Sequence, residues 1–509
     1  MSDSIYDKPY GDSVDRFSSL AGIMRDLPHF ASESFIDGQH VRFDNGFPRK
    51  MGGYIQLITG NFEVIRQIFV VTIANYLRVF VFQDSRVSQF DLTRDGVVSN
   101  IIDRTPVDWS PPTAGTNYIF SVDLLPIQQE GSVPKNYILF TPLNTSKNIY
   151  NNELAPIFIG DVEANIPFIP ITNGTSGGIV VLNNIACIYG SSGTLFYSTP
   201  TNPFGFTESQ IIANEKLIAC RTYRDGLLFW TSSKLIYAVF VGGSIGWQIN
   251  VVASNISILS PSSIVGGHNN TFFWVGVSQF YLFNGAVDML PNPFNKNTFF
   301  ERINYDYAGN CWGMFVENFS EIWWFAPQED GSEATHLYFY DTQNKDWSDT
   351  VMGRSCGFPS GYFLYPMLAS STPNDSESGT YPLWYHEKGY DKVINNVAYP
   401  IPSYFTTRIF SVIEKSPSTN VGIRIRKVEK NFQQVGRMKV EVYGLAYPDS
   451  TPELCDSKTF EPDKTQIDFN AAGRFVYLKF ISNDINGFYQ MGHNLIDYKP
   501  DTTRPTNKY

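Results

Sequence analysis

The chain has 509 residues, a length that normally folds into two or three domains, and 43% of them are hydrophobic, enough to bury a substantial core. Its 49 acidic and 38 basic residues give a net charge of −11. A protein that grips duplex DNA needs Lys and Arg to neutralise the phosphates, so this balance argues against such a role.

The residue types favour strands over helices. Aromatic residues make up 15% of the chain, with 40 Phe and 29 Tyr, whereas charged residues make up only 17%. Aromatic side chains suit the half-buried surface of a pleated sheet. The 39 Gly and 30 Pro supply the turns that many short strands require. Composition therefore predicts an all-β fold.

One helical pattern occurs near the start, in residues 12–27, and Pro28 would end it. The apolar residues at three- and four-residue spacing are Val14, Phe17, Ala21 and Met24. The first residues are polar and acidic, and no run of 18 apolar residues occurs, so we expect neither a secretory signal nor a membrane span. Residues 1–30 are predicted to form a short arm on a soluble protein made in the cytoplasm.

Paired apolar runs separated by turn residues fill residues 31–400 and indicate successive hairpins. The first runs of the pairs are Tyr76–Phe82, Tyr137–Phe140, Ile179–Leu182, Leu227–Trp230, Thr271–Val275, Ile322–Phe325 and Leu383–Tyr385. They start roughly 45 to 60 residues apart, about the length of a four-stranded propeller blade. Such units cannot bury both faces alone and must pack around an axis. We predict a β-propeller of about six blades, with seven also possible.

Residues 401–509 have a different pattern, in which apolar and charged residues alternate. Ile423–Val428 and Met438–Tyr443 are typical of strands with one buried and one wet face. Phe475–Phe480 reads as a further strand. A separate β-sandwich-like domain is expected here, with its boundary near Pro400–Pro402.

Patterns that carry enzyme chemistry are weak or missing. Gly174–Gly178 matches G-x-S-x-G, but a strand follows it where a nucleophile elbow needs a helix. Asp341–Asp346 resembles a calcium loop without its central Gly or bidentate Glu, so a hairpin turn is favoured. The five cysteines form no CxxC pair, and the six histidines are isolated. We expect no catalytic site, no cofactor and no metal.

A basic stripe on one predicted strand is the candidate docking surface. Its members are Arg424, Arg426, Lys427 and Lys430. Arg424 and Arg426 point the same way because side chains alternate along a strand. A solvated sheet face is the favoured explanation, and contact with an acidic partner or with passing DNA is the functional alternative.

Three segments, in order along the chain, resemble one protein family. His40–Tyr54 (HVRFDNGFPRKMGGY) resembles the opening pattern NVRFRNGxPxKxGGW of structural proteins from the tails of short-tailed, podovirus-type bacteriophages. Its matching residues are Val41, Arg42, Phe43, Gly46, Pro48, Lys50, Gly52 and Gly53. Leu235–Tyr237, Gly242–Trp247 and Gly266–Gly267 are similar to the central blades of their hub proteins, and Gly473–Asn483 with Gly487–Gly492 to the closing domain. The family is that of the tail nozzle, hub or packaged-DNA-stabilisation proteins.

This resemblance implies a non-enzymatic virion protein that forms a homo-hexameric ring below the portal and the head-to-tail adaptor ring. Its implied roles are to retain packaged DNA, to hold tail fibres or a needle, and to form the exit channel for DNA ejection without sequence-specific binding. The residues alone support an acidic all-β protein; Asn45-Gly46 predicts a tight hairpin turn, and Gly52-Gly53 a close backbone approach. The alternative is a propeller-type glycan-binding or glycan-degrading tail protein, which would need convergent carboxylates or a platform of exposed aromatic residues.

Overall fold

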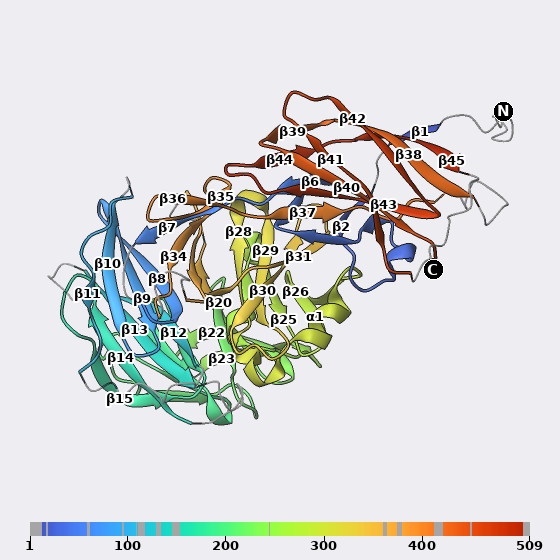
Figure 1. Cartoon of the computed structure of the whole chain (residues 1–509). Helices are drawn as coiled ribbons and strands as arrows, with labels where there is room; N and C mark the ends of the chain where they lie inside the picture. The colour runs from blue at the N-terminus through green and yellow to red at the C-terminus, as the bar shows by residue number, and fades with distance from the viewer. Residues whose placement is uncertain are drawn as a thin grey trace.

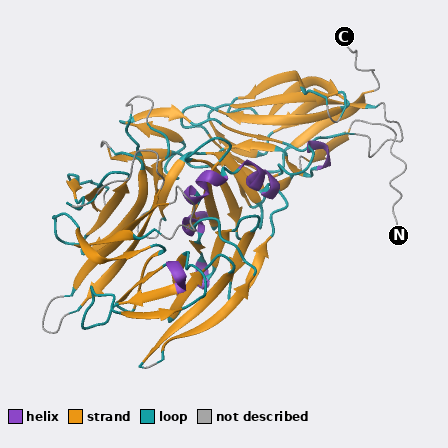
Figure 2. Ribbon diagram, turned by 90° about the horizontal axis from the view of Figure 1, so that it is seen from below, coloured by secondary structure: helices purple, strands orange, loops and turns teal. Residues whose placement is uncertain are grey.

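A computed structural model gives the fold of the chain and describes residues 13–16, 19–58, 62–93, 96–107, 109, 118–128, 134–144, 153–243, 245–359, 364–373, 379–411, 421–447 and 450–501. Within those residues there are 45 strands, a single α-helix, α1 (Lys296–Arg302), and six 3-10 turns. Strands dominate both ribbon views (Figures 1 and 2). The prediction of an all-β fold is confirmed.

Six four-stranded antiparallel sheets follow one another along the chain, each formed by four consecutive strands. They are β8–β11 (Ile65–Ile73, Tyr76–Gln83, Val87–Thr93, Ile102–Asp103), β12–β15 (Tyr118–Ile127, Lys135–Asn144, Ala155–Asp161, Ile169–Thr175), β16–β19 (Gly178–Leu182, Ile185–Tyr189, Thr194–Tyr197, Glu208–Ile211), β20–β23 (Ala219–Tyr223, Gly226–Trp230, Lys234–Gly242, Gly246–Ser254), β24–β27 (Val265–Gly266, Phe272–Val275, Phe280–Phe283, Val287–Leu290) and β28–β31 (Trp312–Val316, Glu321–Pro327, Ala334–Asp341, Trp347–Val351).

A seventh blade closes the ring by joining distant parts of the chain. Strands β32 (Arg354–Phe358), β33 (Met367–Ser370) and β34 (Leu383–His386) pair in order, and β7 (Tyr54–Ile58) supplies the fourth strand. The sheet is extended by β35 (Asp391–Ile394) and β36 (Val397–Pro400). The first strand of this blade, β32, lies against β8, the first strand of the first blade. The domain is a closed propeller of seven blades, one more than the six favoured by the sequence.

The second domain is a β-sandwich made from both ends of the chain. Its sheets have the orders β1-β45-β38-β42, β4-β37-β43-β40-β41 and β39-β44-β6-β5. The strands are β1 (Ser13–Arg16), β4 (Asp37–Gln39), β5 (Val41–Asp44), β6 (Phe47–Lys50), β37 (Ser403–Thr406), β38 (Gly422–Glu429), β39 (Phe432–Val435), β40 (Met438–Leu445), β41 (Glu453–Phe460), β42 (Gln466–Gly473), β43 (Phe475–Ser482), β44 (Phe488–Met491) and β45 (Leu495–Asp501). Figure 1 shows N-terminal strands, in blue, among the orange and red strands of the sandwich.

Two expectations about the N-terminal region are wrong. Residues 12–27 contain no helix within their described part, but β1 and β2 (Leu20–Ile23), because β1 pairs with β45 and β2 pairs with β3 (Ser34–Phe35). The propeller also does not begin at residue 31, since β4–β6 pair with sandwich strands. Partners far away in the sequence override the local pattern in both cases.

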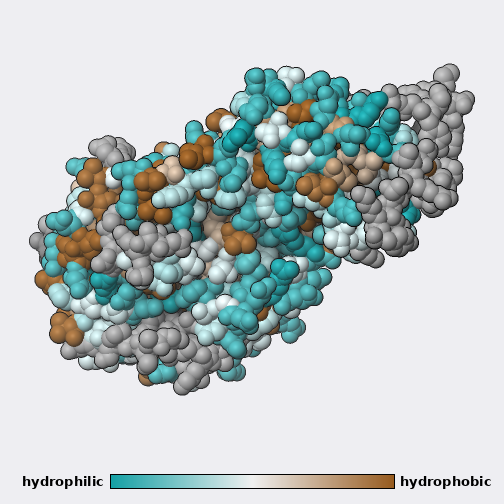
Figure 3. All heavy atoms as spheres, viewed as in Figure 1, coloured by the Kyte–Doolittle hydropathy of each residue, from teal (hydrophilic) through white to brown (hydrophobic). Residues whose placement is uncertain are grey.

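Five tryptophans of the propeller strands lie in the core. The indoles of Trp230, Trp274, Trp323, Trp324 and Trp347 are all fully buried. On the face shown in Figure 3, apolar residues form separate small groups, which is ordinary for a protein surface. No helix within the described residues is long and apolar enough to cross a membrane.

Candidate functional site: the domain junction and the propeller cavity

The opening motif forms a tight hairpin at the junction of the two domains. Strands β5 and β6 pair so that Asp44 faces Phe47, and the turn between them is Asn45-Gly46. Both turn residues have positive φ, 51° for Asn45 and 84° for Gly46, as a type I′ turn requires. The predicted hairpin turn is confirmed.

The two faces of β5 contact different domains. Val41 and Phe43 belong to the sandwich core, whereas Arg42, between them, reaches the propeller. Its guanidinium forms ion pairs with Glu321 of β29, at 3.2 Å, and with Glu387, at 2.9 Å. All three side chains are at most 5% exposed. Arg42 therefore joins one sandwich strand to two blades of the propeller.

The environment of this ion-paired cluster is apolar. The guanidinium of Arg42 lies 3.5 Å from the centroid of the Phe319 ring, and the indole N–H of Trp323 donates to Glu321 at 2.7 Å. Burial raises the pKa of Glu321 to about 7, although the charge of Arg42 opposes the shift. In such a setting each charge depends on its partner, because an unpaired ion in a low-dielectric interior is costly.

The glycine pair of the motif lets the chain touch the propeller backbone. A Cβ on Gly53 would lie 2.3 Å from the carbonyl oxygen of Asp391, and one on Gly52 2.6 Å from the Cα of Glu387. The amide N–H of Gly52 donates to the Glu387 carboxylate at 3.0 Å. The expected close approach is confirmed, and for Gly53 it occurs at Asp391, the first residue of β35.

The remaining motif residues are also structural. Pro48 of β6 lies opposite Phe43 in the hairpin. Lys50 is 1% exposed, and burial lowers the pKa of its amine to about 8. Its Nζ has no hydrogen-bond partner within the described ranges.

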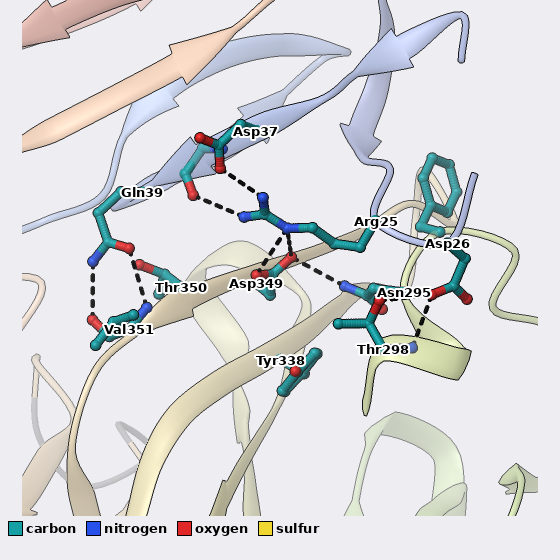
Figure 4. A network of polar contacts seen from close by, with 12 residues as sticks. Arg25, Asp26, Asp37, Gln39, Asn295, Thr298, Tyr338, Asp349, Thr350 and Val351 are labelled. Atoms are coloured by element: carbon teal, nitrogen blue, oxygen red, sulfur yellow. Dashed lines mark hydrogen bonds and ion pairs between the residues drawn. The ribbon is translucent and has the colours of Figure 1, made fainter. Parts of the chain in front are cut away.

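A second polar network fixes the N-terminal segment to the sixth blade (Figure 4). Arg25 bridges Asp37 of β4, at 2.6 Å, and Asp349 of β31, at 3.1 Å. Asp26 accepts from the amide N–H groups of Asn297 and Thr298 at the start of α1. The segment between β2 and β7 thus lies between both domains and contacts each.

The propeller encloses a central cavity of about 390 Å³ lined by the first strands of its blades. Arg66 of β8 pairs there with Asp84, at 2.7 Å, and with Glu333, at 2.9 Å. Arg221 donates to backbone carbonyls, and Asp123 accepts the amide N–H of Val181. Burial raises the pKa values of Asp123 and Glu333. The cavity is small, polar and charged with both signs.

The loop that resembles a calcium site is the hairpin turn between β30 and β31. Asp341 Oδ1 accepts the amide N–H groups of Gln343 and Asn344, so the turn itself uses this oxygen. Within the described residues, no group of three or more His, Cys, Asp or Glu side chains has a metal-binding arrangement. Burial, with Asp341 and Glu321 nearby, raises the pKa of Asp346 to about 8.

Asp346 should make stability depend on pH. Between its ordinary pKa of 3.8 and about 8, the folded chain keeps a proton that the unfolded chain releases. The free energy of unfolding therefore has its full value below the ordinary pKa of 3.8. It falls as the pH rises toward the folded-state pKa of about 8. Asp346→Asn should reduce the fall in the free energy of unfolding between pH 5 and pH 8 by about 1 kcal/mol or more, as measured by urea unfolding. An unchanged decline would contradict the shift.

The G-x-S-x-G segment is a turn between blades. Ser176 lies between β15 and β16, is 7% exposed, and accepts the amide N–H of Ser191 at 2.8 Å. Strands flank the serine on both sides, so the strained strand-to-helix turn of a nucleophile elbow is not formed.

The basic stripe exists, but its charge is balanced within the sandwich. Arg424 pairs with Asp501 at 2.7 Å, Arg426 with Asp497 at 2.8 Å, and Lys427 with Glu429 at 2.6 Å. Lys430 donates to the carbonyl of Pro462. A bulge after Ile425 leaves Arg426 and Lys427 both partly exposed. Among the described residues, three of the four cations of the stripe are thus paired with carboxylates of the sandwich.

Charge reversal of the stripe should first weaken the sandwich. Arg424→Glu with Arg426→Glu would place like charges beside Asp501 and Asp497. We expect the free energy of unfolding to fall by roughly 1 kcal/mol, since both pairs are partly exposed. Arg424→Gln with Arg426→Gln is the milder control. If both double variants are as stable as the wild type, the pairs contribute nothing.

Sequence reasoning missed the acidic partners of Arg42 and the polar cluster around Arg354 and His386. Glu321 immediately precedes the apolar run Ile322–Phe325, and a carboxylate at the edge of such a run was the available signal. Nothing in the sequence marks Glu387 as its neighbour.

No family model matches the chain, and no curated protein is similar to it. Solved structures with weak likeness include a fungal alcohol oxidase of the AA5 family in complex with copper (9% identity, 87% of this chain and 99% of that one, TM-score 0.40). Others are the Mitotic Checkpoint Complex (9%, 76% and 99%, TM-score 0.34) and the WD40 domain of coronin from Toxoplasma gondii (9%, 74% and 86%, TM-score 0.32). These likenesses concern the fold only.

Proposed function

We propose that the chain is a structural virion protein: a subunit of the tail nozzle or hub ring of a short-tailed bacteriophage, placed below the portal and the adaptor ring. The observation that carries the proposal is that residues of the opening motif lie at the junction of the two domains and connect them. Arg42, Gly52 and Gly53, which carry the most specific part of the resemblance, all serve to fix the sandwich on the propeller.

A fixed angle between two domains is what a ring subunit needs. In a closed ring, one surface of each copy meets a different surface of the next, and the geometry must repeat until the ring closes. If the two domains could hinge, the angle between them would differ from copy to copy, and the contacts would not repeat around the ring. The buried ion pairs of Arg42 and the network of Arg25 oppose such a hinge.

The DNA channel of such an assembly would lie between copies. The cavity inside one propeller measures about 390 Å³, and the paired side chains of Arg66 and Glu333 form part of its wall. A duplex, whose major groove alone is about 12 Å wide, does not fit there. The net charge of −11 suits a conduit, because DNA that must leave quickly should not be held by counter-charges. The proposed partners are five further copies, the adaptor ring, and tail fibres or a needle.

Removal of the gene from the phage tests this function. Without the protein, heads should fill with DNA and then lose it, and supplying the chain in trans should restore retention. Infectivity and packaged DNA are measured separately, so that a packaging defect is distinguished from leakage. Heads that keep their DNA and remain infectious without the chain would refute the proposal.

A further inference from the structure

A second pocket, of about 310 Å³, lies where the ring closes and the sandwich begins. Its lining includes His40, Tyr54 of β7, Arg354 of β32, Trp384 of β34 and Lys392 of β35. The side chains of Val351 and Thr372 at its edge are exposed, whereas Arg354, His40 and Trp384 are buried. The pocket thus has a rim open to solvent and a buried floor.

The floor contains a positive charge without a carboxylate. Arg354 is 5% exposed; its Nε donates to His386 Nε2 at 2.8 Å and its Nη1 to the carbonyl of Gly353 at 2.6 Å. Its Nη2 is buried and has no hydrogen-bond partner among the residues that the structure describes. The guanidinium lies 4.7 Å from the centroid of the Tyr54 ring, which covers it without neutralising it.

The other three buried arginines among the described residues have either a carboxylate partner or acceptors for their N–H groups. Arg42 pairs with two glutamates and Arg78 with Asp91. Arg104 has no carboxylate, but its guanidinium donates to Gln89 and to three backbone carbonyls. Arg354 alone among these four combines a lining position in a pocket, a missing counter-charge and an unused nitrogen.

Further donors surround the same space. The indole Nε1 of Trp384 and the ring Nε2 of His40 are buried and have no hydrogen-bond partner in the described part of the chain. Lys392 brings a second cation to the pocket, with its Nζ 5.9 Å from the Trp384 ring. No acidic side chain lines the pocket within the described residues. Burial lowers the pKa values of His40, to about 3, and of His386, so both rings are neutral near pH 7.

We propose that this pocket binds a small phosphate-class oxyanion, held by Lys392 at the rim and by Arg354 Nη2 and the Trp384 indole N–H, which small shifts of their buried side chains would bring to the pocket surface. An anion there supplies the counter-charge that the buried guanidinium lacks. The volume exceeds that of one phosphate, and the aromatic and proline walls accept the body of a phosphate monoester.

The test is titration of the full-length chain with sodium phosphate against sodium chloride at matched ionic strength. We follow the indole N–H signals by NMR, with Trp384→Phe to assign one of them, and the midpoint of thermal unfolding. One indole signal should move saturably, and the midpoint should rise. Methyl phosphate in place of inorganic phosphate shows whether the monoester is preferred; either anion binding supports the site.

Two variants locate the binding. Arg354→Gln should weaken phosphate at least tenfold, whereas Arg424→Gln, at an arginine of the sandwich surface, should leave it unchanged. Lys392→Gln at the rim should weaken it about threefold and keeps the measurement possible if Arg354→Gln does not fold. The proposal would be overturned if chloride gave the same response, if the response did not saturate, or if neither pocket variant changed binding. The pocket would then be a solvent-filled space.

Discussion

Replacing Arg42 by methionine is expected to lower the free energy of unfolding by about 3–5 kcal/mol. The change leaves Glu321 and Glu387 buried without their counter-charge, at 3–5% exposure in the intact cluster. It also removes the contact with Phe319 that joins the hairpin to the propeller. Urea unfolding followed by tryptophan fluorescence measures the loss.

Two further variants separate the buried cluster from ordinary surface effects. Arg49→Met removes the pair with Asp44, whose side chains are about one-third exposed, and should cost less than about 1 kcal/mol. The triple variant Arg42→Met, Glu321→Met and Glu387→Met should recover most of the stability, because no charge remains buried alone. A cost of Arg42→Met no larger than that of Arg49→Met would contradict the role assigned to the cluster.

Gly53→Ala is expected to cost roughly 3 kcal/mol, because the new methyl group meets backbone atoms that cannot turn away. The nearest are the carbonyl oxygen of Asp391 at 2.3 Å and its amide nitrogen at 2.4 Å. The hairpin and β35 must separate to admit it. We expect a lower unfolding midpoint together with faster hydrogen exchange in residues 391–394.

Gly46→Ala provides the matched control within the same motif. Gly46 has a φ of 84° and nothing within 4 Å of an added Cβ, so only backbone strain of about 1 kcal/mol is expected. Gly53, in contrast, is limited by space and not by a positive φ. If the two substitutions cost the same, the close approach at Gly53 is not what fixes the junction.

Local patterns in the sequence were sufficient for much of the fold. Every apolar run assigned to a blade contains or overlaps a strand, and Asn45-Gly46 forms the turn that its residue types require. In the sequence, Val41 and Phe43 alternate with Arg42, and this alternation separates the two faces of a strand. It did not show that both faces are buried, because the second face is covered by a different domain.

Features that depend on distant partners could not be predicted. The strand β1 has its partner at the other end of the chain, in β45, and in isolation its pattern reads as helical. Arg42 meets Glu321 and Glu387 from 279 and 345 residues away. The stripe around Arg424 seemed basic because Asp497 and Asp501 lie on another strand. The arginines of this strand are paired with carboxylates on a neighbouring strand and not with residues next to them in the sequence.

Electron cryomicroscopy of assembled phage tails tests the central claim most directly. The account predicts six copies of this chain in one closed ring below the adaptor, each with its propeller and sandwich at the same fixed angle and with the DNA path between copies. A dimer, a ring in which the angle between the domains varies, or tails that lack the chain would contradict it.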